Sequence, residues 1–141
     1  MKRRFVLALI GACSLLITVF LLWTYYGNTE YATKTKHETD SWVVIKDSKG
    51  DILAVETIKP TVWNTLANLK KNQTEMWIGG IVEEYANYWG FRFRPDTIVV
   101  AEITIEGAQS NIQGISEDLN YWINIWSREA YVLSSVIEIN E

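Results

Sequence analysis

The fold class is decided by residues 89–106, which read WGFRFRPDTIVVAEITIE. From residue 89 to residue 94, aromatic side chains alternate with glycine and arginine, so every second side chain faces the same way on an extended chain. Pro95 and Asp96 end this alternation; residues 98–101 are all aliphatic, and aliphatic side chains then alternate with polar ones from residue 101 to residue 106. The stretch therefore predicts two strands, 89–94 and 98–106, each with one apolar and one polar face, as in an antiparallel sheet.

Before this stretch, the sequence predicts a hairpin followed by a helix. Residues 42–45 and 52–58 are rich in Val and Ile, and they flank the turn 47–50, in which a glycine supplies a positive φ. In residues 60–71, apolar side chains recur with the i, i+4, i+7 spacing of one helical face. Pro60 occupies the first turn of this helix, where a missing backbone N–H is tolerated.

Three further elements complete the predicted fold. Residues 75–85 form a strand, with a bulge expected at Gly79–Gly80. Residues 110–126 return to helical spacing, with Ser116 as the N-cap and with any helix before it expected to be broken at Gly114; residues 131–139 form the last strand. The order of the elements predicts an α+β fold: a mostly antiparallel sheet of about five or six strands with two helices, preceded by a single N-terminal transmembrane helix.

The N-terminus predicts a membrane anchor. Basic residues at positions 2–4 precede residues 5–26, which form an uncharged run of 22 residues. A helix of that length is about 33 Å long, and the hydrocarbon core of a bilayer is about 30 Å thick. Because basic flanks stay on the cytoplasmic side, we expect residues 1–26 to be a single-pass signal anchor in the cell membrane. Residues 5–26 would contact the lipid bilayer, with the N-terminus in the cytoplasm and the C-terminal domain outside.

Three alternatives to an uncleaved anchor stay open. A secretory signal would be removed, although its apolar region spans only about 7–15 residues and needs a small-x-small cleavage site. Residues 10–13, Ile-Gly-Ala-Cys, resemble a lipobox with Cys13 as the lipidated residue, but the apolar run continues well past it. A pilin-like leader would be cut after Arg4 and would make the protein a filament subunit. The long uncharged run favours the anchor.

Composition restricts the chemistry of the remainder. Residues 27–40 are polar and predict a stalk, which leaves residues 41–141 as the extracytoplasmic domain. Three of the 13 basic residues belong to the N-terminus, so ten basic and 17 acidic side chains follow it, a net charge of −7 that argues against nucleic acid as a partner. Cys13 and His37 are the only residues of their types. We therefore expect no disulfide, no Cys-ligated metal site, no Ser-His-Asp triad and no cofactor.

Four stretches of the chain carry a resemblance to a known family: residues 78–82, 89–98, 101–106 and 134–137. Together they resemble the small domain named after the N-terminal part of a slime-mould calmodulin-binding protein, which also occurs in secreted or anchored bacterial and archaeal proteins. The resemblance covers about residues 41–141. Arg92 stands where that family has a His, Gly107-Ala108-Gln109 replaces its Val-Cys-Asp, and its Pro-Trp before the last strand is absent. The resemblance implies a small extracytoplasmic domain and neither an activity nor calmodulin binding.

Five residues are predicted to form a binding surface: Tyr85, Tyr88, Arg92, Glu102 and Glu106. The two tyrosines flank a predicted turn, and exposed rings beside carboxylates suit stacking on sugars or on a partner protein. The two glutamates lie on one face of the predicted strand 98–106, about 13 Å apart. That separation exceeds the about 5–9.5 Å found between glycosidase carboxylates. We instead expect Glu102 and Glu106 to pair with arginines of the neighbouring strand on the solvent face.

These features favour one function over two others. The favoured function is a membrane-anchored extracytoplasmic binding or interaction module without catalysis, whose partner is a cell-surface protein or glycan. Trp89, Trp122 and Trp126 are assigned to its core rather than to a ligand platform, because a domain of this size needs large buried side chains. The alternatives are a carboxylate-dependent hydrolase of cell-surface glycans and the pilin-like filament subunit.

Overall fold

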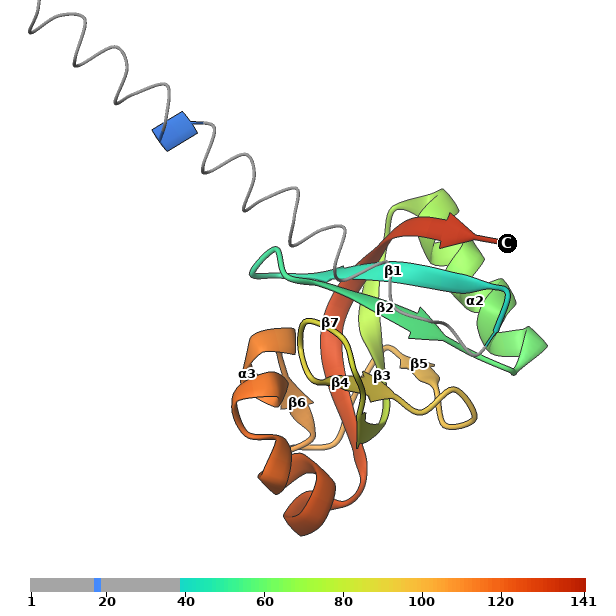
Figure 1. Ribbon diagram of the computed structural model, residues 1–141. Coiled ribbons are helices and arrows are strands. Elements are labelled where there is room, and N and C mark those ends of the chain that lie inside the picture. The colour runs from blue at the N-terminus through green and yellow to red at the C-terminus, as the bar shows by residue number, and fades with distance from the viewer. Residues whose placement is uncertain (1–16, 19–38) are drawn as a thin grey trace, which may run out of the picture.

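The computed structural model of the protein describes residues 17–18 and 39–141. The described part has an α+β fold with a mostly antiparallel sheet of seven strands and three helices, as Figure 1 shows. The elements in chain order are β1 (Trp42–Asp47), β2 (Ile52–Glu56), α2 (Pro60–Asn72), β3 (Glu75–Glu84), β4 (Phe91–Phe93), β5 (Val99–Ala101), β6 (Gln109–Ser110), α3 (Ile112–Glu117), the π-helix η1 (Tyr121–Trp126) and β7 (Glu129–Asn140). The predicted α+β class and mostly antiparallel sheet are confirmed, with one strand and one helix more than expected.

The last strand of the chain lies in the middle of the sheet. The strand order is β2-β1-β7-β3-β4, with β5 pairing to β3 beside β4 and β6 pairing in parallel to β7. The two ends of this path approach each other, because the Trp89 indole N–H, just before β4, donates to the Ile52 carbonyl at the start of β2 (2.7 Å). The sheet is therefore curled, and its concave side encloses the core.

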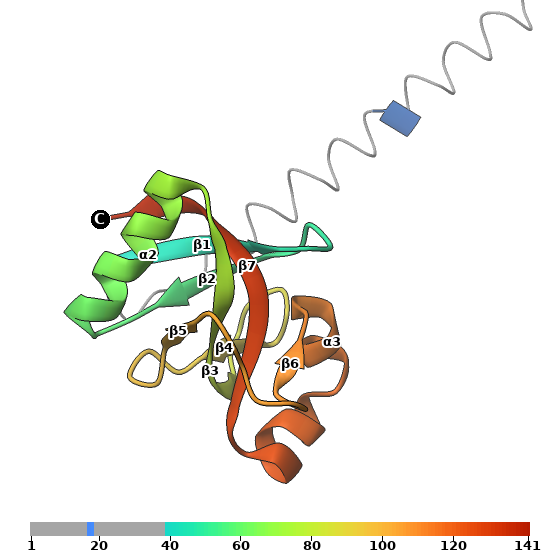
Figure 2. The same ribbon diagram turned by 180° about the vertical axis from the view of Figure 1, so that it is seen from behind.

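The core is built from the inward-facing side of the strands and from one face of each helix. Phe91 and Phe93 are fully buried on β4, as their predicted alternation requires, and their rings meet edge to face. Leu66 and Leu69 of α2 are buried, and Pro60 begins that helix as predicted. Figures 1 and 2 show α2 at one end of the domain and α3 with η1 at the other. Trp122 is buried, while Trp89 and Trp126 are half-buried and pack against the core.

The predicted hairpin forms around a buried carboxylate. Gly50 has a φ of 89° in the turn between β1 and β2, as expected. The Asp47 carboxylate accepts hydrogen bonds from the backbone amides of Lys49 (2.9 Å) and Asp51 (3.0 Å) within this turn. Its second oxygen accepts a third bond from the amide of Ile112, at the start of α3 (3.0 Å). Asp47 therefore ties the hairpin to a helix that lies 65 residues further along the chain.

The prediction of a β-bulge at Gly79–Gly80 is wrong. The pairing of β3 with β7 is continuous from Glu75 to Ile81, and the register shift in this sheet lies instead between β1 and β7. The glycines serve close packing: a Cβ on Gly79 would lie 1.9 Å from the Ala130 carbonyl oxygen of β7. Glycine is needed here because only a residue without a side chain permits such an approach.

The strand predicted over 98–106 is too long, because β5 ends at Ala101. β5 lies on one side of β3, whereas β6 pairs with β7, which lies on the other side of β3. The chain must cross the sheet between them, and we call residues 102–107 the crossing segment. Crossing interrupts strand pairing, so Ile103 and Ile105 stay 84% and 64% exposed despite their strand-like alternation.

The predicted strand 89–94 is also shortened, to residues 91–93. Gly90 has a φ of 75°, and the Tyr85 amide donates to the Gly90 carbonyl (3.0 Å), which closes a loop that includes Trp89. A positive φ cannot be accommodated within a regular strand. Trp89 therefore reaches the core from a loop and not from a strand.

The helical region predicted over 110–126 contains two helices, and the break predicted at Gly114 is wrong because α3 continues through it. α3 begins at Ile112 with Asn111 as its N-cap, whose side-chain oxygen accepts from the Gly114 amide (2.9 Å). The predicted N-cap Ser116 lies inside α3, and its hydroxyl donates instead to the Trp89 carbonyl (2.7 Å). A π-helix, η1, follows. Its wider turn still places Trp122 and Trp126 against the core, as the apolar spacing predicted.

The N-terminal predictions lie largely outside the described residues. Of the predicted anchor 1–26, the structure describes residues 17 and 18, and both are helical. Among residues 17–18 and 39–141, no helix has both the length and the apolar character needed to cross a bilayer. The end of the predicted stalk is fixed to the sheet, because the Thr39 amide donates to the buried Glu56 carboxylate (2.9 Å).

Candidate functional site

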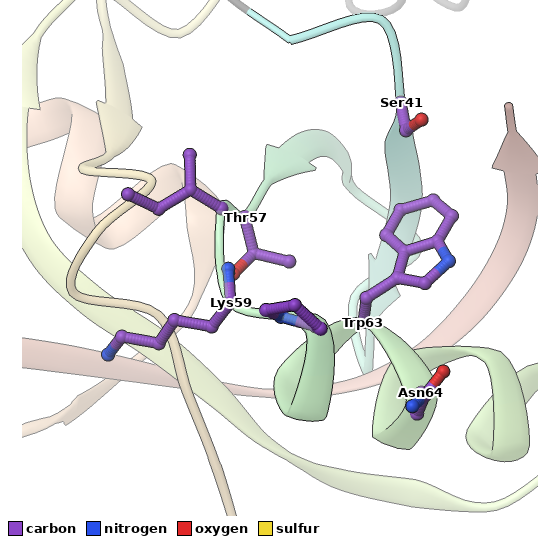
Figure 3. Close-up of a pocket in the computed structure, with 7 residues that line it drawn as sticks. Ser41, Thr57, Lys59, Trp63 and Asn64 are labelled. Atoms are coloured by element: carbon purple, nitrogen blue, oxygen red, sulfur yellow. The ribbon is translucent and has the colours of Figure 1, made fainter.

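A surface hollow of about 280 Å³ lies at the start of α2, close to the point where the described domain begins. Its lining, drawn in Figure 3, comprises Ser41, Thr57, Ile58, Lys59, Pro60, Trp63 and Asn64. These residues come from the segment before β1, the connection from β2 to α2, and the first turns of α2. The hollow therefore forms where the segment before β1 meets the connection and the helix that follow β2.

Local hydrogen bonds shape the connection between β2 and α2. The Thr57 hydroxyl accepts a hydrogen bond from the Lys59 amide (3.1 Å), which holds the chain in a tight turn before Pro60. The Ile58 amide donates to the Pro95 carbonyl (3.4 Å), so the connection is also fixed to the turn after β4. The Trp63 amide donates to the Lys59 carbonyl (3.0 Å) and begins the α-helical ladder. This geometry presents the Trp63 ring beside the turn.

The lining combines flat apolar surface with uncharged polar groups. Trp63 is half-buried and packs against the core, and together with Pro60 it supplies apolar walls. Ser41, Thr57 and Asn64 supply two hydroxyls and an amide, which can each donate and accept hydrogen bonds. The seven lining residues include no carboxylate, imidazole or thiol. Such a surface can hold a ligand by apolar contact and by hydrogen bonds.

The one charged group at the hollow is directed elsewhere. Figure 3 shows Lys59 extending away from Trp63, and its ammonium group donates to the Ile98 carbonyl (3.4 Å). The hydrogen bond from Arg94 holds the pKa of the Asp96 carboxyl below its usual value, and the positive charge of Lys59 lowers that pKa further. The Lys59 ammonium group is therefore bound to a backbone carbonyl and is not directed at the Trp63 ring.

The structure brings three of the five predicted binding residues together. Arg92 pairs with Glu83 across β3 and β4 (2.6 Å), and its guanidinium lies 4.3 Å from the centre of the Tyr85 ring. Tyr88 belongs to the same hairpin loop and is 49% exposed, with its ring edge to face against Trp89. The Arg92 side chain is only 12% exposed, so Tyr88 is the part of this surface most open to a partner.

The other two predicted residues, Glu102 and Glu106, lie apart from this surface. Both are exposed in the crossing segment rather than on a strand. The predicted pairing with arginines is wrong, because Arg92 pairs with Glu83 and Arg94 with Asp96 (3.1 Å). The strand that pairs with β4 is β3 and not the segment after β5, so Arg92 lies opposite Glu83. Within residues 39–141, neither Glu102 nor Glu106 forms an ion pair.

An exposed carboxylate without an ion pair should contribute little to stability. We expect Glu102→Gln to change the free energy of unfolding by less than about 0.5 kcal/mol, the usual range for surface substitutions. Urea unfolding of the full-length chain at pH 7, followed by circular dichroism, measures this change. A loss of more than about 1 kcal/mol would show that the carboxylate has a structural partner.

The hollow was not predicted from the sequence, although Trp63 gave a signal. Val62 and Leu66 lie on the apolar face of the helix, and Trp63 flanks that face in the first turn, three residues after Pro60. A large aromatic ring at the edge of a helix face often remains partly accessible. The contributions of Ser41 and Thr57 could not be foreseen, because they depend on how β1 and β2 meet α2.

Comparisons with protein-family models, with curated proteins and with solved structures find no match for this chain. The resemblance to the slime-mould domain family therefore rests on the quoted residues alone. Among residues 17–18 and 39–141, no group of three His, Cys, Asp or Glu side chains is arranged to hold a metal ion.

Proposed function

We propose that the protein is a membrane-anchored extracytoplasmic binding module that holds a neutral sugar of a cell-surface glycan against Trp63 without transforming it. The observation that supports this most directly is the lining of the hollow, which combines an indole and a proline ring with two hydroxyls and an amide. An indole face packs against the C–H face of a sugar, and the polar groups exchange hydrogen bonds with its hydroxyls.

The placement of the acidic residues favours binding over the alternative of a glycan hydrolase. A glycosidase needs two carboxylates about 5–9.5 Å apart on either side of the scissile bond. The lining of the hollow contains none, and Glu102 and Glu106 lie on the crossing segment, which contributes no residue to it. The net charge of −7 after the N-terminal region also favours a neutral ligand over an acidic one.

The anchored location is part of the same proposal. It is supported by the uncharged run 5–26 behind three basic residues. The bond from Thr39 to Glu56 would set the orientation of the domain on its stalk, because it fixes the last stalk residues to β2 close to the hollow. The filament-subunit alternative uses the same N-terminal segment, and N-terminal sequencing of the membrane-bound protein would separate the two: a chain that begins at Phe5 supports the filament subunit.

Binding is tested with the full-length chain in an uncharged detergent. We expect neutral mono- and disaccharides to bind and their uronic acid counterparts to bind more weakly, as measured by saturation-transfer NMR and calorimetry. Trp63→Ala should weaken binding by about tenfold or more, because an aromatic contact contributes about 0.5–1.5 kcal/mol beyond the area it buries. Trp63→Phe should retain part of the affinity.

Tyr88→Ala is the matched control, because it removes an exposed ring from the other candidate surface. If Tyr88→Ala abolishes binding while Trp63→Ala does not, the ligand lies on the β3–β4 hairpin and the hollow is not the site. If no saccharide binds, the sugar assignment is wrong. Cleavage of an oligosaccharide, detected by mass spectrometry after incubation, would contradict a purely binding function.

A further inference from the structure

The crossing segment exposes a strand-like sequence that has no strand beside it. Residues 102–106 read EITIE, in which three β-branched residues lie between two glutamates. Such residues favour extended, paired chain. Nevertheless, among the described residues no backbone amide of residues 103–105 donates to another backbone carbonyl. After β5 the chain bends at residues 102 and 103 and leaves the sheet, so the backbone amides of this segment lie beside no strand.

The crossing segment also carries exposed aliphatic surface. Ile103 is 84% exposed and Ile105 is 64% exposed. The π-helix η1 lies beside the end of this segment, since a Cβ on Gly107 would be 3.7 Å from the Trp126 ring. Large aliphatic side chains that are exposed next to one another, rather than singly, are typical of interaction sites.

The segment is held in place rather than loose. The Ala108 amide donates to the Ile105 carbonyl (3.1 Å), which closes the turn at its end. The Gln109 side chain donates to the Thr104 hydroxyl (2.8 Å). A partner segment would therefore meet a partly ordered backbone, which lowers the entropy cost of pairing.

The charges around the isoleucines select the occupant. Glu102 and Glu106 bracket Ile103 and Ile105, and both acids are exposed without an ion pair among the described residues. A second copy of this chain would bring like charges together, and anionic lipid headgroups would be repelled in the same way. A partner segment with Lys or Arg side chains between aliphatic ones would complement both the charges and the apolar surface.

We propose that the crossing segment is the docking site for an extended segment of a partner protein in which aliphatic and basic residues alternate. The partner lies extended along residues 102–105, on the segment that leaves the sheet after β5. Main-chain hydrogen bonds hold the added strand, the isoleucines pack against its aliphatic side chains, and the glutamates pair with its basic ones. This site is separate from the hollow at α2 and does not depend on the sugar-binding proposal.

The probe is a capped nonapeptide of alternating valine and lysine, and its counterpart of alternating valine and glutamate is the control. We expect the basic peptide to slow amide hydrogen exchange of residues 102–106 in the full-length chain in uncharged detergent, and the acidic peptide to leave it unchanged. Ile103→Asp should lower the affinity for the basic peptide by about tenfold or more, because burying one aliphatic side chain contributes that much to binding. Because Ile103 is exposed, this substitution should leave the fold intact.

Charge reversal tests the specificity. The double variant Glu102→Lys, Glu106→Lys should reverse the preference and bind the acidic peptide. Glu84→Lys with Glu138→Lys changes the net charge equally at exposed positions elsewhere, and it should keep the original preference. Exchange that neither peptide slows, or that both slow equally, would overturn the proposal. Slow amide exchange of residues 102–106 without any peptide would also overturn the proposal. If it is seen in lipid nanodiscs, lipid occupies the segment; if it is seen only at high protein concentration, a second copy of the chain does.

Discussion

Gly79→Ala should prevent the domain from folding, or destabilise it by more than about 4 kcal/mol, which is exceptional for a single substitution. The added Cβ would lie 1.9 Å from the Ala130 carbonyl oxygen and 2.9 Å from the Tyr131 Cα. Both atoms belong to the backbone of β7, which pairs with β1 on one side and with β3 on the other. The clash cannot be relieved by rotating a side chain, so the two central strands would have to separate.

The measurement is urea unfolding of the full-length chain by circular dichroism, with Gly114→Ala as the matched control. A Cβ on Gly114 would come closest to the Ser110 hydroxyl, at 2.9 Å, and that side chain can turn away. Because alanine also favours a helix over glycine by about 1 kcal/mol, the control should be close to neutral. A Gly79→Ala protein that unfolds at the wild-type urea concentration would refute the close approach of β3 and β7.

Asp47→Ala should lower the free energy of unfolding by about 3–4 kcal/mol. The carboxylate is buried and accepts three backbone hydrogen bonds, from Lys49, Asp51 and Ile112. Leaving one buried amide without an acceptor costs about 1–3 kcal/mol, and each of the two turn bonds contributes about 0.5–1.5 kcal/mol. The loss should therefore affect both the hairpin and the packing of α3.

Two further variants separate the contributions to this loss. Asp47→Asn keeps one acceptor oxygen for the turn but cannot also accept from the Ile112 amide, so it should recover about half of the loss. Asp96→Ala removes an exposed carboxylate that pairs only with Arg94, and it should leave the unfolding midpoint nearly unchanged. If Asp47→Ala and Asp96→Ala behave alike, the Asp47 carboxylate does not join the hairpin to α3.

The strongest periodic signals in the sequence predicted local structure well. Phe91 and Phe93 are buried on β4, and Leu66 and Leu69 are buried on α2, because alternation and helical spacing reflect which side of an element faces the core. The ends of elements were less predictable. The strand signal continued to Glu106, but the position of β6 beside β7 forces the chain to leave the sheet after Ala101.

The candidate binding surface was predicted only in part, for a related reason. The two tyrosines and Arg92 come together because they are close in sequence and share one hairpin. Glu102 was assigned to Arg92 on the assumption that consecutive strands pair with each other. β4 and β5 instead each pair with β3, so Arg92 meets Glu83.

By itself, the sequence determined the α+β class, the mostly antiparallel sheet, the helix at Pro60 and most of the inward-facing side chains. These features depend on short-range spacing and on the conformational limits of proline and glycine. Only the tertiary structure decided the central place of β7, the close contact at Gly79, the crossing segment with its exposed isoleucines, and the hollow beside Trp63. Each of these depends on which distant segments lie side by side, and strand order is set by the packing of the whole core rather than by any local pattern.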